Sequence, residues 1–359
     1  MASVSIPFAD DSEFPARTEF RRAPPRKKIR RMMIKNKGVV VLCVLSLTFI
    51  FFLGNYHLDM LNVNYLFFST NERSISKEKG EFLIIPQSDC GDDPPFLVYL
   101  VTVSHPQWKE RNAIRQTWGK DQRTDGKRTV AYFLLGYNAR YQSMILNESL
   151  HYQDIIQKNF TDTYYNLTLK VLMGIEWTHE FCPSVSFVMK TDSDMFVNTY
   201  YLTELLSERT RTHLYTGFVK ANEKPIRYAL SKWYLSKEEY PQSTLPPFCS
   251  GTGYVFSGDL VEKIITVSKH IPILKLEDVY FGLCLQKLNV TPVELQPVQP
   301  FHVRKVEFSI CNFHKLVTSH GVSPVELLIY WRTLGKNSKE ECWRKTEEFL
   351  WVPTPENRT

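Results

Sequence analysis

The 359-residue sequence contains no internal repeat and no low-complexity tract, and none of its seven cysteines has the spacing of zinc ligands. These absences exclude repeat architectures and zinc-finger domains. Hydrophobic residues make up 43% of the chain and aromatic residues 13%, which is enough for a sizeable core, so the protein is not disordered. The length fits one large domain or two of ordinary size.

Acidic residues are absent from residues 21–37, where nine Lys and Arg side chains are concentrated. These nine exceed the net charge of +6, so the rest of the chain carries no basic excess. We therefore expect no nucleic-acid partner.

An uncharged stretch, 38–54, follows directly and is at the short end for a membrane-spanning helix. A cleaved signal peptide would have a shorter leader and a small-residue cleavage site, and a buried soluble helix is rarely apolar on every face. The positive flank places the N-terminus in the cytoplasm, and a short span suits the thin bilayers of the early secretory pathway. We predict a cytoplasmic tail over 1–37, a signal-anchor over 38–57, a stem over 58–92 and a lumenal catalytic domain over 93–359.

Asn-x-Ser/Thr sequons occur only after the predicted span, as expected for a lumenal domain. They lie at Asn147, Asn159, Asn166, Asn289 and Asn357. Asn166 also sits where a helix could begin, so it is alternatively an N-cap. Disulfides are expected among the six cysteines in this oxidising compartment, but their 15 possible pairings stay open. These are Cys90, Cys182, Cys249, Cys284, Cys311 and Cys342.

From residue 96 onward, strand-like and helix-like patterns alternate. Apolar runs predict buried strands at 96–103, at 129–136 and from residue 185 to Asp192, and helical spacing predicts helices at 166–180 and near 200–208. This alternation predicts an α/β fold with a mostly parallel sheet under helical layers.

Two carboxylates, Asp192 and Asp194, stand at the end of the third predicted strand. In an extended segment residues i and i+2 point to the same side, and ligands bind at the carboxyl ends of parallel strands. Such a pair suits a hard divalent cation that in turn holds a phosphate. The alternative is a solvated turn.

Two arginines, Arg111 and Arg115, share a helix face because they are four residues apart. Near the end of the first strand their guanidinium groups would suit a diphosphate, although a solvated basic face explains the spacing equally well. A glycine-rich stretch over 246–259 predicts close backbone approach to a ligand or a sharp turn. Two acids, Glu277 and Asp278, open a predicted helix that continues to residue 288, where they could simply complement the helix dipole.

In this order the motifs resemble the β-1,3-glycosyltransferase family over about residues 96–330. The resemblance is carried by Glu110–Gly119, Lys190–Asn198, Cys249–Gly258, Glu277–Gly282 and His320–Pro324. Asn159 departs from the family, which usually has Asp there, but Asp162 and Lys170 remain in register.

The resemblance implies a GT-A type fold and a type II Golgi membrane enzyme. Its donor would be UDP-galactose and its acceptor a terminal β-linked N-acetylglucosamine on a glycolipid or glycoprotein, joined through the 3-hydroxyl with inversion. An N-acetylglucosaminyl donor on the same fold, or a catalytically inactive membrane-anchored glycan-binding protein, are the alternatives.

The resemblance also implies residue roles. Asp194, Asp192 and His320 would hold Mn²⁺, with Asp192 also near the ribose, whereas a lone surface histidine is the other interpretation of His320. Asp278 would be the general base, with Glu277 as the alternative. The donor would be bound by Arg111, Arg115, Asp162, Lys170 and Asp192, and the acceptor by Trp233, Ser250, Gly251, Gly253 and Tyr254.

Overall fold

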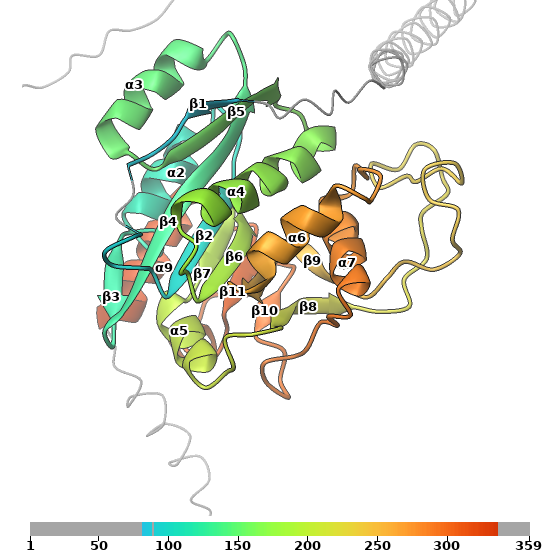
Figure 1. Cartoon of the computed structure of the whole chain (residues 1–359). Coiled ribbons are helices and arrows are strands. Elements are labelled where there is room, and N and C mark those ends of the chain that lie inside the picture. Colours follow the sequence, from blue (N-terminus) through green and yellow to red (C-terminus); the bar gives the residue numbers. More distant parts are fainter. Residues whose placement is uncertain (1–80, 88–89, 337–359) are drawn as a thin grey trace, which may run out of the picture. The chain divides into compact units, whose positions relative to one another are not determined.

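The structure, a computed structural model, describes residues 81–87 and 90–336. Its centre is a mixed sheet with the strand order β1-β5-β4-β2-β6-β9-β8, and β3 pairs with β4 (Figure 1). The four middle strands β5, β4, β2 and β6 are parallel, whereas β1, β3, β9 and β8 pair antiparallel with their neighbours. The expected α/β architecture with a mostly parallel central sheet is confirmed.

The strands of this sheet are β1 (Phe82–Ile84), β2 (Leu97–Thr102), β3 (Gln122–Thr124), β4 (Lys127–Tyr137), β5 (Ile155–Thr161), β6 (Phe187–Asp192), β8 (Tyr215–Lys220) and β9 (Phe248–Ser257). A smaller sheet of order β10-β11-β7 is formed by β7 (Met195–Val197), β10 (Phe301–His302) and β11 (Thr318–His320). The helices are α2 (Trp108–Arg115), α3 (Gln142–Tyr152), η1 (Tyr164–Asn166), α4 (Leu167–Phe181), α5 (Thr199–Ser207), α6 (Leu260–Ser268), α7 (Glu277–Lys287), α8 (Ile310–Phe313) and α9 (Pro324–Lys336).

Helices cover both faces of the large sheet because side chains alternate between the two faces of each strand. In β2, Val98 and Leu100 point into a core with α4, α6 and α7, while Leu97, Tyr99 and Val101 pack with α2, α5 and α9. All five side chains are fully buried, as expected for parallel strands covered on both faces. Figure 1 shows α4 and α6 in front of the sheet and α2 and α9 behind it.

Most of the glycine-rich stretch 246–259 forms one long strand, β9, and not a sharp turn. β9 runs antiparallel between β6 and β8, and Gly253 lies opposite Thr191. Its small residues allow close approach to neighbouring elements, because a Cβ on Gly253 would lie 3.2 Å from the Met189 methyl carbon. At Gly253 the close approach is therefore to the neighbouring strand, and approach of the backbone to a ligand stays a prediction.

The folded unit begins earlier than the predicted boundary at residue 93. β1 lies within the predicted stem and pairs with β5, and Cys90 is bonded to Cys182 at the end of α4. The tail and signal-anchor predictions fall outside the described residues. Within the described ranges, no helix is both long and apolar enough to cross a membrane.

Disulfide bonding is only partly as expected. The Cys90–Cys182 bond is present and Cys311 is also disulfide-bonded, but Cys249 and Cys284 are buried free thiols. The backbone N–H of Cys249 donates to the Tyr215 hydroxyl at 2.8 Å, and burial raises the pKa of both thiols to about 12, which keeps them protonated and unreactive.

We expect these two thiols to be hidden rather than oxidised. Alkylation of the native protein should leave Cys249 and Cys284 unlabelled, because both are buried. Alkylation in denaturant without reductant should label both of them and should leave Cys90 and Cys182 unmodified until a reductant is added. Peptide mass spectrometry distinguishes the four positions, and a Cys249–Cys284 cross-linked peptide would contradict the assignment.

Candidate active site

Asp192 and Asp194 lie at the carboxyl end of β6, at the sheet edge where the parallel strand β2 also ends. Asp192 is the last residue of β6, but Ser193 and Asp194 form a turn that leads into β7. The two carboxylates are therefore neighbours across a turn, and the extended spacing expected from sequence does not apply. The turn is held because the Asp194 carbonyl accepts from the backbone N–H of Val322 at 2.9 Å.

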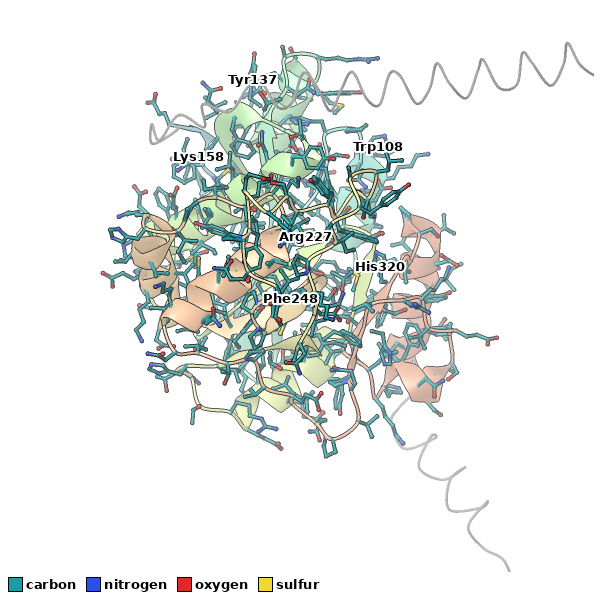
Figure 2. All side chains as sticks on the ribbon, turned by 90° about the vertical axis from the view of Figure 1, so that its right-hand side faces the viewer. Trp108, Tyr137, Lys158, Arg227, Phe248 and His320 are labelled. Carbon is teal, nitrogen blue, oxygen red and sulfur yellow. A yellow bond between two sulfur atoms is a disulfide. The ribbon has the colours of Figure 1, made fainter. Side chains whose placement is uncertain are left out.

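Asp194 forms an ion pair with His320. His320 Nε2 lies 3.2 Å from Asp194 Oδ2, because β11 pairs antiparallel with β7 and places His320 opposite Met195. Burial raises the pKa of the Asp194 carboxyl, but the His320 ring outweighs it, so the net pKa lies below its ordinary value. The hydrogen bond to Asp194 in turn raises the pKa of His320. His320 is visible on the face shown in Figure 2.

Asp192 is oriented by other partners. Its Oδ1 atom accepts from Lys190 Nζ and from the Thr102 hydroxyl, both at 2.7 Å. Within the described part of the chain, no group of three or more His, Cys, Asp or Glu side chains is arranged to hold a metal ion. Asp194 and His320 therefore form a contacting pair, with Asp192 beside it and turned toward Lys190.

Lys190 connects the strand-end carboxylates with the two acids that open α7. Its ammonium group is fully buried, contacts Asp192, donates to the Gly251 carbonyl and lies 3.6 Å from Glu277 Oε2. Burial disfavours the charged form, but Asp192 and Glu277 outweigh it and hold the pKa of Lys190 above its usual range. A lysine inside an apolar strand is the signal that could have revealed this link from sequence, since lysine is rarely buried without partners.

Gly251 in β9 lies directly against Glu277 and Asp278. Its N–H donates to Asp278 Oδ2 at 3.1 Å, and Asp278 Oδ1 accepts from the backbone N–H of Val279 at 2.9 Å. A Cβ on Gly251 would lie 3.3 Å from Glu277 Oε2 and 3.4 Å from Asp278 Oδ2, so a larger residue would press directly on both carboxylates. Burial raises the pKa of Asp278 even though these N–H groups and Lys190 oppose it.

Glu277 is the more deeply buried of the two acids. Its Oε1 accepts from the Tyr254 hydroxyl, and only 3% of its side chain is exposed. Burial, opposed by Lys190 and assisted by Asp278, raises the pKa of Glu277 from 4.5 to about 7. Glu277 is therefore held by two side chains, Tyr254 and Lys190, whereas Asp278 is held by backbone N–H groups.

This raised pKa predicts a pH-dependent stability. A carboxyl whose pKa is higher in the folded state contributes stability that is complete below about pH 4.5 and is lost as the pH rises through about 7. As the pH rises through this window, the wild type should lose up to about 3 kcal/mol of unfolding free energy relative to Glu277→Gln, which has no carboxyl to titrate at this position. Urea unfolding at several pH values measures it, and a pH-independent difference would contradict the assignment.

Arg111 and Arg115 do not approach the carboxylates of the site, which corrects the expectation that they bind a diphosphate. Arg111 is fully buried and donates to both oxygens of Glu148 at 2.7 and 2.6 Å and to the carbonyls of Ser104 and His105 at 3.0 to 3.3 Å.

Arg115 forms a two-point contact with Asp154, at 2.6 and 2.8 Å, and a 2.8 Å ion pair with Glu148. Its guanidinium group also stacks on Tyr152, 3.8 Å from the ring centre. Both arginines thus belong to a cluster that fixes α2, α3 and the segment that follows β2.

Removing Arg111 should be costly for folding. Arg111→Met leaves the largely buried Glu148 with one fewer cation and frees two carbonyls, and breaking such a network costs about 3–5 kcal/mol. Arg123→Met is the matched control, because Arg123 and its partner Asp93 are about half exposed and such pairs contribute about 1 kcal/mol or less. Denaturant unfolding compares them, and equal losses would contradict a buried cluster.

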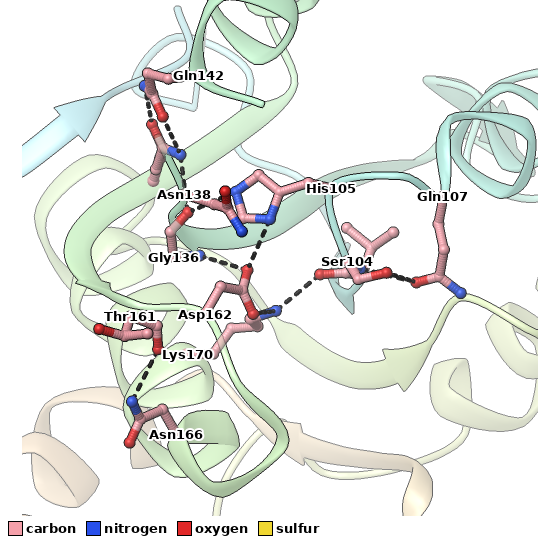
Figure 3. A network of polar contacts seen from close by, with 12 residues as sticks. Ser104, His105, Gln107, Gly136, Asn138, Gln142, Thr161, Asp162, Asn166 and Lys170 are labelled. Atoms are coloured by element: carbon pink, nitrogen blue, oxygen red, sulfur yellow. Dashed lines mark hydrogen bonds and ion pairs between the residues drawn. The ribbon is translucent and has the colours of Figure 1, made fainter. Parts of the chain in front are cut away.

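Asp162 and Lys170 form a second buried network at the same sheet edge (Figure 3). Lys170 Nζ lies 2.7 Å from Asp162 Oδ1 and donates to the Val103 carbonyl, also at 2.7 Å. Asp162 Oδ2 accepts from the Gly136 N–H at 2.9 Å and lies 3.6 Å from His105 Nδ1. Burial lowers the pKa of Lys170 and of His105. The pair holds the segment that follows β2 through the Val103 carbonyl. Contact of Asp162 and Lys170 with the donor remains a prediction.

Among the expected acceptor residues, Trp233 is exposed, whereas Tyr254 and Ser250 are buried. Trp233 is about half exposed and lies beside Tyr164, whose pKa is raised by burial and by the charges of Asp278 and Asp192. Trp233 and Tyr164 therefore border the acidic groups. Tyr254 is fully buried against Glu277, so contact with an acceptor is excluded and its role is to support that carboxylate. Ser250 is buried in β9.

The sequons within the described residues are positioned differently. Asn147, Asn159 and Asn289 are exposed, whereas Asn166 is half-buried and its amide donates to the Thr161 carbonyl at 2.8 Å. Asn166 occupies the position before α4, but its side chain makes no capping bond. Asn357 lies outside the described residues. Glycosylation at these positions remains a prediction.

Acidic groups at the carboxyl ends of parallel strands, next to a second acidic pair and the exposed rings of Trp233 and Tyr164, lie where α/β enzymes bind their ligands. The class of protein comes from the sequence comparison, in which residues 109–296 match the family described as Galactosyltransferase. The chain belongs to this family and is a member of the β-1,3-galactosyltransferases.

Similar curated proteins carry that name. The chain is 52% identical over 271 residues to beta-1,3-galactosyltransferase 5 of Homo sapiens, covering 75% of this chain and 87% of the relative. It is 43% identical over 291 residues to beta-1,3-galactosyltransferase 2 of Homo sapiens, covering 77% and 69%. Among solved structures, the WbbM bifunctional glycosyltransferase is similar with a TM-score of 0.37 and 11% identity, covering 70% of this chain and 52% of that one.

Proposed function

We propose that this protein transfers galactose from UDP-galactose to the 3-hydroxyl of a terminal β-linked N-acetylglucosamine, with inversion at the sugar carbon. The observation that carries the proposal is the arrangement around Gly251 and Lys190. The Asp194–His320 pair and Asp192 lie at the end of β6, and Asp278 is held on the Gly251 N–H. Inversion requires a base on the side of the acceptor hydroxyl, opposite the departing diphosphate, and the two acidic groups suit these two tasks.

The strand-end residues fit a divalent cation. Asp194 and His320 are each partly exposed and supply one carboxylate and one imidazole, a donor set compatible with Mn²⁺. When bound, Mn²⁺ would neutralise the diphosphate of the donor. Asp192, fixed by Lys190 and Thr102, would support this site or contact the ribose.

Asp278 is the better candidate for the general base. Its two oxygens each accept one backbone N–H, which leaves lone pairs for a hydroxyl, and burial raises its pKa and hence its basicity. The neighbouring Glu277 already accepts from Tyr254 and faces Lys190. Asp278 therefore removes the proton of the acceptor hydroxyl, and Glu277 positions Lys190.

The cellular setting of the proposal comes from the sequence outside the described residues. The basic segment 21–37 followed by the uncharged stretch 38–54 supports a type II membrane anchor in the Golgi. The Cys90–Cys182 disulfide supports folding in an oxidising compartment, which is compatible with a lumenal domain.

A donor panel tests the proposal. The full chain would be incubated with an N-acetylglucosamine-terminated glycoside, Mn²⁺ and UDP-galactose, UDP-N-acetylglucosamine or UDP-glucose, and the linkage of each product would be determined. We expect transfer from UDP-galactose with a β-1,3 linkage. Transfer only from UDP-N-acetylglucosamine would show the other donor specificity, and glycan binding without transfer from any donor would show a binding protein.

A further inference from the structure

The segment between β8 and β9 exposes apolar side chains on a closed turn. Tyr228 is 65% exposed and Leu230 69%, with Ile226 and Trp233 at 41% and 49%. In Figure 1 this segment is the yellow loop that projects past α7. Apolar side chains grouped in this way on an outer loop are typical of an interaction surface.

The turn is closed by a network of backbone and side-chain hydrogen bonds. Ile226 forms a bridge with Tyr234, and the Leu235 N–H donates to the Ile226 carbonyl at 2.9 Å. Arg227 donates to four backbone carbonyls at 2.6 to 2.9 Å and ties the two sides of the loop together, at the centre of the face shown in Figure 2. The four carbonyls belong to Leu235, Ser236, Tyr240 and Gln242. The loop thus holds Tyr228 and Leu230 outward.

Basic residues surround the apolar tip. Residues 220–237 contain five Lys and Arg side chains and one acid, Glu223, and the pair Glu238 and Glu239 begins only after the turn has closed. Lys224 and Lys232 are exposed, and Lys232 lies over the ring of Trp233. Aromatic and aliphatic side chains flanked by lysines are complementary to the interface of an anionic lipid surface, where the rings enter the headgroup region and the ammonium groups meet phosphates.

The same loop borders the candidate active site. Trp233 lies beside Tyr164. Lys275, two residues before Glu277, lies 5.3 Å from the ring centre of Tyr234 and 3.4 Å from Glu239. A surface that engages this loop therefore comes close to the entrance used by an acceptor.

We propose that Tyr228 and Leu230, with Lys224 and Lys232, dock on a lipid surface and present the site to acceptor glycans attached to lipids in that surface. This proposal rests on the proposed function, because it specifies how its acceptor is carried. Docking raises the rate at which the site encounters lipid-linked acceptors and leaves the transfer step itself unchanged.

The test compares one glycan in two forms. The full chain would be reconstituted in phosphatidylcholine vesicles containing phosphatidylglycerol and given an N-acetylglucosamine-terminated glycolipid in the same vesicles, or the same glycan as a soluble short-chain glycoside. We expect the double variant Tyr228→Ser, Leu230→Ser to lower kcat/KM for the glycolipid about tenfold or more and to leave the soluble acceptor unchanged. Leu150→Ser is the matched control, because Leu150 is 77% exposed on α3, and it should change neither rate.

Charge reversal provides a second measurement. Lys224→Glu with Lys232→Glu should lower glycolipid transfer in anionic vesicles, by roughly fivefold for each lysine, and should have little effect in phosphatidylcholine alone. An equal loss with both acceptors would place the loop in the sugar-binding site and overturn the proposal, as would unchanged glycolipid transfer in the double variant. Failure of the wild type with both acceptors would instead overturn the proposed function.

Discussion

Asp278→Asn is expected to slow galactose transfer by roughly 10²-fold or more, because a positioned general base contributes about 10²–10⁴-fold to the rate. Asparagine retains one acceptor oxygen for the Val279 or Gly251 N–H but cannot accept a proton from a hydroxyl. Binding of UDP and Mn²⁺ should persist, since Asp194 and His320 are unchanged. Initial rates and calorimetric titration with UDP and Mn²⁺ separate the two effects.

Glu277→Gln is the control for the neighbouring acid. Glutamine still accepts from Tyr254, so the variant should fold, but Lys190 loses a partner charge and transfer should fall less than in Asp278→Asn. A normal rate for Asp278→Asn together with an inactive Glu277→Gln would transfer the role of base to Glu277. Loss of UDP binding in Asp278→Asn would make Asp278 part of the donor site.

The second large effect is expected for Asp194→Asn, which should lower Mn²⁺-dependent transfer by about 10²–10³-fold. Charge stabilisation by a bound cation contributes several kcal/mol to the transition state, and the amide removes the charged ligand next to His320. Thermal unfolding adds a readout that is independent of turnover. Mn²⁺ with UDP should raise the midpoint of the wild type and not that of the variant.

Asp121→Asn is the matched control for this substitution. Asp121 is about half exposed and pairs with Arg128 near the start of β4, whereas the candidate site lies where β2 and β6 end. Its loss should change neither transfer nor the Mn²⁺ response. Full activity of Asp194→Asn, or full activity of the wild type in excess chelator, would exclude a metal role for the strand-end carboxylates.

The secondary structure around the site was predictable because its signals are local. The apolar runs of β2, β4 and β6 and the helical spacing of α4 indicated buried strands and a helix, and the structure confirms them. β9 was not predicted as a strand, because small residues indicate turns or close contacts when they are considered without the strands that enclose them. The register with β6 and β8 decides the structure there.

The site residues show where sequence reasoning ends. Asp192 and Asp194 were predicted as site residues because two acids follow a buried strand. Both lie at the end of that strand, although a turn replaces the extended geometry between them. The arginines were misassigned because their partner Glu148 lies 37 residues beyond Arg111, with no local pattern that connects them. Tyr254 was placed on the acceptor for a similar reason, since its contact with Glu277 is 23 residues away.

The pairing of β7 with β11 has a consequence for how the enzyme matures. Asp194 precedes β7, but His320 reaches it only when residues 318–320 have paired with residues 195–197. A chain emerging during synthesis carries the acidic turn for more than a hundred residues before it contains the histidine, and contacts between such distant segments form late in folding. The strand-end pair is thus assembled late, and a chain interrupted before β11 would carry the acids of the site without their imidazole.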